Sequence, residues 1–309
     1  MCARHACSPL EALLVDSAFD ADVYPDEPMR RHTMYRIGGP ARFYVQVGSI
    51  GALKRLVGAC QECRVPWVAV GRGSNLLVSD EGFPGVVIAL GRDFRACRFD
   101  EETCSFIVGA GVPLSSVVQE SFRRSLSGLE FAVGTPGTVG GAVRMNAGTR
   151  EQGIADRVVS VTTLSPSSGL VRREAADIQW GYRSSSFAPD EVIVECELAV
   201  KPADPYLLRG KMEAAHTRRK KTQPLTLPSC GSVFKNPEGY SAGQLIEQAG
   251  LKGARVGGAQ ISEVHANFIV NRDNATAQDV VELINMARSK VYEAYGIELQ
   301  PEVRFLGFA

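Results

Sequence analysis

The sequence predicts an α+β protein made of three consecutive units. In the first unit, strand-like runs at 33–47, 67–70 and 85–90 alternate with a helix-like stretch at 50–64, which is typical of a small α/β unit. In the second unit, three strand-like runs follow one another between 158 and 200 with no helix between them, which favours an antiparallel sheet. The third unit is rich in helix-like stretches and contains one further strand.

The N-terminal part is predicted to be peripheral. Residues 1–30 contain one short helix-like stretch over 9–19, followed by an acidic, proline-containing link. Cys2, His5 and Cys7 are expected to lie in a tail without a metal site, and the acidic Glu11 and Asp16 interrupt the apolar segment that a secretion signal would need. We therefore expect a cytoplasmic protein.

The helices of the third unit have clear boundaries. The helix-like stretch 205–221 ends in Arg218-Arg-Lys-Lys221, and prolines follow it. A short helix over 242–249 is closed by Gly250. Thr276 with Asp279 forms a capping-box pattern at the start of a long helix, which Gly296 ends. The apolar face of that helix consists of Val280, Ile284, Ala287 and Val291.

Two glycine-rich stretches carry the functional signal. One is Gly71-Arg-Gly-Ser-Asn75, and the other spans 134–148 and contains five glycines around one proline. Glycine at this density suits positive φ angles or a ligand that lies directly against backbone N–H groups. Two such loops indicate a large anionic ligand, for which a dinucleotide is the natural candidate. The first loop lacks the third glycine and the helix opening of a Rossmann fingerprint, which excludes that fold.

Composition narrows the function classes. The 309 residues are 45% hydrophobic and 22% charged, and the net charge is zero, so nothing favours nucleic acid or an anionic membrane as a partner. Cys60-Gln-Glu-Cys63 has the spacing of half a zinc site, but the second half is missing, so we expect no metal. Buried or idle thiols are the favoured interpretation of these cysteines.

Five motifs in order resemble one enzyme family. They are Gly71-Arg-Gly-Ser-Asn75, Gly134-Thr-Pro-Gly137 with Asn146-Ala-Gly148, Gly181-Tyr-Arg183, Cys230-Gly-Ser-Val-Phe-Lys-Asn-Pro237 and Pro301-Glu-Val-Arg-Phe305. The series closely resembles the UDP-N-acetylenolpyruvoylglucosamine reductases (MurB), flavoenzymes of peptidoglycan precursor synthesis. The short segment between Arg183 and Ser232 resembles the branch of the family that lacks a lid insertion in the substrate domain.

The resemblance implies fold, cofactor and reaction. The fold would be α+β, with a two-part FAD-binding domain of the vanillyl-alcohol-oxidase (PCMH) type and a smaller α/β substrate domain. NADPH would reduce FAD, and the reduced flavin would reduce the enolpyruvyl ether of UDP-N-acetylglucosamine to UDP-N-acetylmuramate. The implied boundaries are an N-terminal extension (1–30), FAD-binding subdomains 1 (31–98) and 2 (99–204), a substrate-binding domain (205–300) and a C-terminal strand returning to the active site (301–309). We expect a monomer.

Three residues match the family's catalytic positions. Hydride addition to an enolpyruvate moves negative charge onto the carboxylate, and the fixed fork of donors on Arg183 suits that charge. Glu302 matches the family's C-terminal carboxylate. Ser232 matches the proton donor to the developing carbanion, a role that a serine can fill when the acceptor is a strongly basic enolate, with Lys235 as a neighbour.

The remaining assignments follow from the family motifs. The expected cofactor-binding residues are Tyr35, Gly71, Arg72, Gly73, Ser74, Asn75, Leu76, Gly134, Thr135, Pro136, Gly137, Gly141, Asn146 and Gly148. The expected substrate-binding residues are Tyr182, Arg219, Lys235, Asn236 and His265. Taken singly, each of these residue types is more often structural, and a lone histidine near a strand is usually a satisfied core residue.

Two other functions stay open at this point. A sugar or alcohol oxidase would keep the FAD fold, but it often tethers its cofactor to a histidine or cysteine, and neither glycine-rich stretch contains one. A nucleotide-binding regulatory or scaffold protein would explain the glycine loops and the cationic cluster around Arg219. It would leave Arg183, Ser232 and Glu302 without a purpose.

Overall fold

The computed structural model of the chain describes residues 8–149 and 151–308. The chain forms two compact units, which alternate along the sequence. The first unit comprises Met1–Asp26, Arg42–Gly71 and Gly85–Met212, and the second comprises Glu27–Ala41, Arg72–Pro84 and Glu213–Ala309. The sequence-based domain boundaries stay a prediction, and the expectation for Cys2, His5 and Cys7 concerns residues outside the described part.

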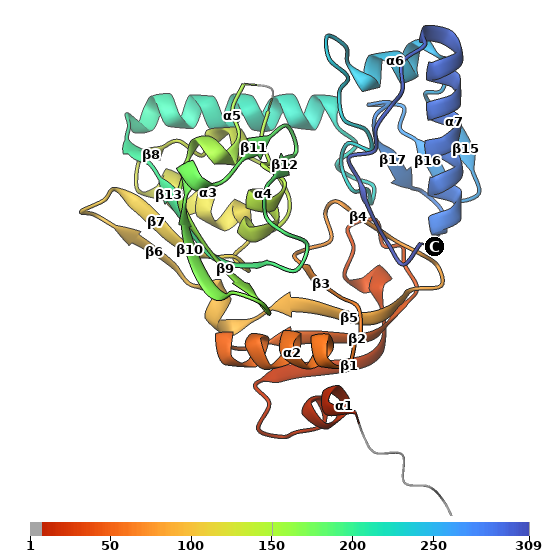
Figure 1. Cartoon of the computed structure of the whole chain (residues 1–309). Helices are drawn as coiled ribbons and strands as arrows, with labels where there is room; N and C mark the ends of the chain where they lie inside the picture. Colours follow the sequence, from red (N-terminus) through yellow and green to blue (C-terminus); the bar gives the residue numbers. More distant parts are fainter. Residues whose placement is uncertain (1–7, 150, 309) are drawn as a thin grey trace, which may run out of the picture. The chain divides into compact units, whose positions relative to one another are not determined.

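A four-stranded sheet and one helix form the N-terminal half of the first unit. Its strands are β1 (Ala21–Pro28), β2 (Pro40–Val47), β3 (Trp67–Val70) and β5 (Phe83–Leu90), in the order β1-β2-β5-β3. Strands β3 and β5 are parallel. The chain order of β2, a helix and β3 follows the predicted strand–helix–strand pattern. Helix α2 (Ile50–Glu62) runs along this sheet (Figure 1), and its side chains Leu53, Leu56 and Val57 are fully buried in a core shared with β2 and β5.

The extension before this sheet is more ordered than the sequence predicted. Helix α1 (Pro9–Leu14) is shorter than expected and buries Leu10 and Leu13. The expected link is instead strand β1, so that prediction was wrong. Proline cannot donate to a strand ladder and is confined to edge strands, and β1 lies at the edge of its sheet. Pro25 and Pro28 therefore led the sequence prediction to a link instead of a strand, although an edge strand tolerates both prolines.

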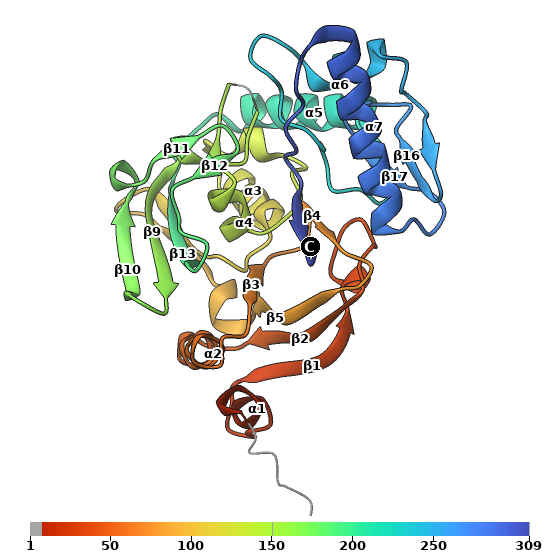
Figure 2. The ribbon, with the colours of Figure 1, turned by 45° about the vertical axis from the view of Figure 1, so that its right-hand side comes forward.

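A five-stranded antiparallel sheet forms the other half of the first unit. Its strands are β6 (Cys97–Asp100), β7 (Ser105–Gly109), β9 (Val158–Ser165), β10 (Gly169–Glu174) and β13 (Val192–Ala199), in the order β10-β9-β13-β7-β6. Figure 2 shows β10, β9 and β13 side by side. This confirms the antiparallel sheet expected between 158 and 200. Two helices of this region are α3 (Leu114–Arg123) and α4 (Val139–Arg144). Short strands pair as β11 (Trp180–Gly181) with β12 (Ser184–Ser185), and as β8 (Leu126–Ser127) with β14 (Lys201–Pro202).

The chain also contains short 3₁₀ turns and one long helix, α5. The 3₁₀ turns are Met29–Arg31, Arg92–Arg95, Glu130–Ala132, Ile154–Asp156 and Ala175–Asp177. Helix α5 (Pro205–Thr222) confirms the helix expected at 205–221. No helix of residues 8–149 and 151–308 is long and apolar enough to cross a membrane.

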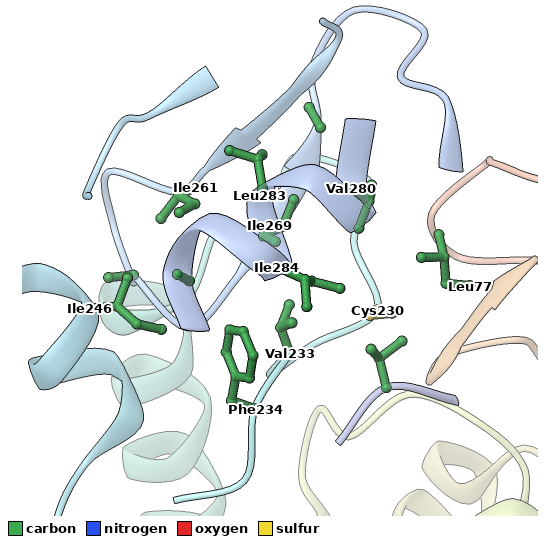
Figure 3. Close-up of a cluster of buried hydrophobic side chains, with 14 of the residues drawn as sticks. Leu77, Cys230, Val233, Phe234, Ile246, Ile261, Ile269, Val280, Leu283 and Ile284 are labelled. Carbon is green, nitrogen blue, oxygen red and sulfur yellow. The ribbon is translucent and has the colours of Figure 1, made fainter. Parts of the chain in front are cut away.

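The second unit is built around one amphipathic helix. Its elements are β4 (Leu76–Val78), α6 (Ala242–Gln248), β15 (Arg255–Val256), β16 (Ala259–Ile261), β17 (Ile269–Asn271), α7 (Ala277–Tyr295) and β18 (Arg304–Leu306). The capping box of Thr276 with Asp279 begins α7, and Gly296 ends it with φ +67°. Both ends are as the sequence predicted. The apolar face of α7 packs on β16, β17 and the segment that carries Val233 and Phe234 (Figure 3).

The C-terminal tail pairs with a distant strand. Residues Arg304–Leu306 form β18, which runs parallel to β4 in the register Arg304 to Leu76. The tail was expected to form a strand over 301–309, but among residues 301–308 only these three form a strand. The pairing places the end of the chain beside the residues that directly follow the first glycine loop.

Candidate active site

Most glycines of the stretch 134–148 are required by the protein itself. A Cβ atom on Gly140 would lie 2.8 Å from the Ala110 Cβ, and one on Gly148 would lie 2.1 Å from the Gln152 carbonyl oxygen. Gly134 and Gly137 have φ +71° and +112°, which side chains rarely adopt. Close packing and turn geometry therefore explain these four glycines without a ligand.

Gly141 is the exception in this stretch. It is exposed, its φ is not positive, and a Cβ atom there would meet only Thr138 Oγ1, at an ordinary 3.5 Å. The tip beside it, Gly134-Thr-Pro-Gly137, exposes Gly134 and Pro136 and half-buries Thr135. An exposed glycine that the fold does not need suits a ligand lying flat against the backbone.

The first glycine loop has free backbone donors. Within residues 8–149 and 151–308, the N–H groups of Arg72, Gly73 and Ser74 donate to no protein acceptor. Gly73 has φ +60°, and a Cβ atom there would lie 2.3 Å from the His32 carbonyl oxygen. Successive free N–H groups in a turn form a concave site for an anion. This loop therefore offers a site for an anionic group.

The other residues of the first loop have protein partners. A Cβ atom on Gly71 would lie 2.4 Å from Thr138 Oγ1, so packing alone requires this glycine. Asn75 Nδ2 donates to the Glu302 carbonyl oxygen at 3.0 Å, and the Arg304 N–H donates to the Asn75 carbonyl oxygen at 3.0 Å. With Leu76 in β4, the end of the loop thus holds the C-terminal segment that carries Glu302.

Tyr35 is a core residue. Its side chain is fully buried beside Cys230, and burial raises the pKa of the Tyr35 hydroxyl well above its usual value. Its carbonyl oxygen accepts a 3.0 Å hydrogen bond from Asn271 Nδ2. A cofactor contact of Tyr35 would therefore have to use its backbone.

Arg183 is joined to the second glycine stretch. It lies in the turn of the β11–β12 hairpin with φ +54°, and its Nη2 donates to the Gly148 carbonyl oxygen at 2.8 Å. Its guanidinium carbon lies 5.1 Å from the ring centre of the exposed Tyr182. Asn146 Nδ2 donates to the Gly181 carbonyl oxygen at 3.1 Å. The structure thus brings together Arg183, Tyr182, Asn146 and Gly148.

In the second unit, Ser232 and Glu302 lie on neighbouring segments. The Glu302 N–H donates to the Val233 carbonyl oxygen at 2.7 Å, and the Lys235 N–H donates to the Gln300 carbonyl oxygen at 2.9 Å. Ser232 itself forms an antiparallel bridge with Phe268. Ser232, Lys235 and Glu302 are all half-buried, so each is accessible to a small molecule.

Asn267 was missed by the sequence reasoning. Its side chain is 3% exposed, and it accepts from the Phe234 N–H at 2.9 Å while Nδ2 donates to the Phe234 carbonyl oxygen at 2.8 Å. The carbonyl oxygen of Asn267 also accepts from the Val233 N–H. An asparagine between apolar residues in a strand-like run, Ala266-Asn-Phe-Ile-Val270, was the available signal.

The other expected substrate-binding residues have structural surroundings. Asn236 Oδ1 accepts from the Ala242 N–H at 3.0 Å, at the start of α6. His265 Nδ1 accepts from the Asn267 N–H at 3.2 Å, and its ring packs on Phe268. Burial lowers the pKa of His265 below its usual 6.5. Arg219 lies in the last turn of α5, where burial lowers the pKa of its guanidinium.

Comparisons with known families match both parts of the chain. Residues 41–173 match the model of an FAD binding domain, and residues 223–306 match the C-terminal domain of UDP-N-acetylenolpyruvoylglucosamine reductase. A reductase of that name from Heliobacterium modesticaldum is 45% identical over 91% of this chain and 90% of its own length. The chain belongs to the UDP-N-acetylenolpyruvoylglucosamine reductase family.

Other members agree in sequence and in structure. A reductase from Geobacter sulfurreducens is 39% identical over 96% of this chain and 98% of its own length. The crystal structure of the Thermus caldophilus reductase matches with a TM-score of 0.80 at 36% identity, over 93% of this chain and 98% of that one. These matches confirm the family and the fold class that the motifs predicted.

Proposed function

We propose that this family member reduces the enolpyruvyl ether of UDP-N-acetylglucosamine to UDP-N-acetylmuramate with NADPH and FAD. The observation that carries the proposal is that the segments of Ser232 and Glu302 lie side by side. These two residues stand 70 positions apart, yet the Glu302 N–H donates to the Val233 carbonyl oxygen and the Lys235 N–H donates to the Gln300 carbonyl oxygen. In the proposed reaction both act at the enolpyruvyl end of the substrate: Ser232 on the carbon that receives the proton, and Glu302 on the carboxylate.

The first glycine loop and Gly141 would hold the cofactor. The free N–H groups of Arg72, Gly73 and Ser74 suit its phosphates, and the exposed face of Gly141 suits a flat group. Bound there, FAD would supply to the terminal methylene carbon of the enolpyruvyl group a hydride that comes from NADPH.

The side chains of the protein meet the charge that this addition creates. The guanidinium of Arg183 presents two N–H groups in one plane, which suits the substrate carboxylate as it gains enolate character. Ser232 donates its hydroxyl proton to the neighbouring carbon, and the cation of Lys235 stabilises the alkoxide that remains. Glu302, which is half-buried, would hydrogen-bond to the substrate carboxylate in its protonated form.

The nucleotide end of the substrate needs cationic and polar partners. Arg219 suits the diphosphate because a guanidinium forms paired hydrogen bonds with phosphate oxygens. Tyr182, Lys235, Asn236 and His265 complete the proposed substrate contacts. The enzyme would act in the cytoplasm as a monomer, where its product supports peptidoglycan synthesis and therefore cell shape and division.

The anaerobic visible spectrum of the purified protein tests the function. Flavin bands that bleach on addition of NADPH, and return on addition of the enolpyruvyl sugar nucleotide, would support both half-reactions. Bands that return only with air would keep a flavoprotein but reject this acceptor, as the oxidase alternative predicts. Absence of flavin bands after FAD is supplied would reject the role of the glycine loops and leave the scaffold alternative.

A further inference from the structure

Hydrogen bonds join residues 144–148 of the first unit to residues 181–185. They involve every second residue of 144–148, and we call this contact the arginine clasp. Ser185 Oγ donates to the Arg144 carbonyl oxygen at 2.6 Å. Asn146 Nδ2 donates to the Gly181 carbonyl oxygen at 3.1 Å, and Arg183 Nη2 donates to the Gly148 carbonyl oxygen at 2.8 Å. The middle contact of the three belongs to Asn146.

The side chain of Asn146 is engaged at both ends. Its Nδ2 holds the Gly181 carbonyl oxygen, and its Oδ1 accepts from the Ala155 N–H at 3.2 Å. Gly153 lies directly against it, since a Cβ atom there would come within 2.7 Å of Oδ1. The backbone of Asn146 has φ +42°, a conformation that asparagine adopts more readily than most residues. Asn146 therefore ties three separate backbone segments together.

The hairpin needs such a tie because its turn is strained. Arg183 has φ +54°, which is uncommon for a residue with a long side chain and persists only when the surroundings impose it. The strands that flank the turn, β11 and β12, contain two residues each. So short a hairpin gains little from its own ladder. The hydrogen bond from Asn146 fixes Gly181, two residues before Arg183.

We propose that Asn146 is a positioning residue that acts through Arg183, and not a ligand of the flavin. It holds the Gly181 carbonyl oxygen so that the guanidinium of Arg183 is aimed where the enolate charge develops. The inference rests on the proposed role of Arg183. It is an alternative to the expectation from the family motif that Asn146 binds the cofactor.

The substitution Asn146→Gly separates the two roles. Glycine accepts φ +42° without strain, so the change removes the two side-chain hydrogen bonds and leaves the backbone free to keep its shape. We expect kcat to fall about 10- to 100-fold, because a displacement of about 1 Å in a catalytic group can cost about 100-fold. The affinity for FAD should stay within about twofold of the wild type, since no cofactor contact is lost. In stopped-flow experiments, reoxidation by the enolpyruvyl sugar nucleotide should slow, while reduction by NADPH should not.

Two further variants support the interpretation. Asn146→Asp keeps the acceptor for Ala155 but places an oxygen against the Gly181 carbonyl oxygen, so we expect a comparable loss of kcat. It is also the variant to measure if Asn146→Gly does not fold. Asn274→Gly is the matched control, because Asn274 is exposed, has φ +53° and lies outside the site. Its kinetics should equal those of the wild type.

A double-mutant cycle with Arg183→Ala decides whether Asn146 acts through Arg183. If it does, adding Asn146→Gly to Arg183→Ala should cost less than about twofold, since the group being positioned is already gone. Effects that multiply would overturn the inference, and so would a loss of FAD affinity with normal turnover per bound flavin. If Arg183→Ala itself turns over normally, the proposed role of Arg183 fails instead, and the inference falls with it.

Discussion

The side-chain amide of Asn267 forms two hydrogen bonds with the backbone of a single residue, Phe234. Its Oδ1 accepts from the Phe234 N–H, and its Nδ2 donates to the Phe234 carbonyl oxygen, at 2.9 and 2.8 Å. The amide thereby makes the two backbone hydrogen bonds that a residue of a neighbouring strand would make. Ser232 stands two residues before Phe234, so the segment that carries the proposed proton donor is held from the side opposite Glu302.

We expect Asn267→Ala to destabilise the protein by about 2–4 kcal/mol. Phe234 is 2% exposed, and the change would leave its N–H and carbonyl oxygen buried without partners, which costs about 1–3 kcal/mol for each unsatisfied group. Urea unfolding of the full chain measures this difference. Gln61→Ala, on the exposed face of α2, is the control and should change the stability by less than about 0.5 kcal/mol. Equal midpoints for the two variants would show that the amide of Asn267 is not needed.

Ser232→Ala should remove turnover and leave the cofactor in place. General acid catalysis contributes about 100- to 10,000-fold, so we expect kcat to fall within that range while FAD binding stays unchanged. The rate of NADPH oxidation in the presence of the enolpyruvyl sugar nucleotide measures kcat. Ser116→Ala, on the exposed face of α3, serves as the control. Turnover of the Ser232 variant within about threefold of the wild type would exclude Ser232 as the proton donor.

Local sequence patterns predicted an element well where its own residues cap both of its ends. The capping box at Thr276 and the left-handed Gly296 define α7 without any tertiary contact. Pairing between distant segments could not be predicted in this way. The strand at the C-terminus was expected, but its partner, β4, was not. Strand β1 was missed altogether, because it forms by pairing with β2 at the edge of the sheet.

The same distinction between local patterns and distant contacts applies to the candidate site. The motifs named Arg183, Ser232 and Glu302 as catalytic candidates, which stays a prediction, but they could not separate residues that touch a ligand from residues that hold others in place. Gly148, Asn146 and Asn75 stand inside the motifs, yet their hydrogen bonds go to Arg183, Gly181 and the Glu302 segment. Asn267 stands outside every motif because its partner, Phe234, is 33 residues away.

We expect Glu191→Gln to destabilise the first unit by about 1–3 kcal/mol at neutral pH. The carboxylate is buried and accepts hydrogen bonds from both Nη atoms of Arg173, and the Ala188 N–H donates to it at 2.7 Å. Hydrogen bonds to a charged group contribute about 1.5–3 kcal/mol. Glu195→Gln, in strand β13 just after Glu191 but exposed, is the matched control. Urea unfolding at pH 7 compares the two variants.

The effect of Glu191 should depend on pH with a defined sign. Burial alone would raise the pKa of Glu191, but the hydrogen bonds from Arg173 and Ala188 and the charge of Arg173 outweigh it and lower the pKa below its usual 4.5. The stability from ionised Glu191 is therefore complete above about pH 4.5 and is lost as the pH falls through the lower folded-state pKa. The difference between wild type and Glu191→Gln should narrow below pH 4.5. A difference that stays constant down to pH 3 would contradict the role of its charge.

His265 should stay neutral where the enzyme works. Burial lowers the pKa of its ring below 6.5, and the Asn267 N–H donates to Nδ1, which only an unprotonated Nδ1 can accept. At pH values between the lowered folded-state pKa and 6.5, the unfolded chain binds more protons at His265 than the folded chain does. The stability that neutral His265 contributes is therefore complete above pH 6.5 and declines as the pH falls through that window.

An NMR titration of the histidine rings, assigned with His265→Gln, measures this pKa directly. The midpoint for His265 should lie below 6.5, and the stability of the His265→Gln variant should lose its dependence on pH in the same window. A midpoint above 6.5 would refute the burial argument. Repeating the titration with the anionic sugar nucleotide bound tests the proposed substrate contact, because an anion beside the ring favours protonation and raises the midpoint. An unchanged midpoint would leave His265 as a packing residue that helps Asn267 to hold the Ser232 segment.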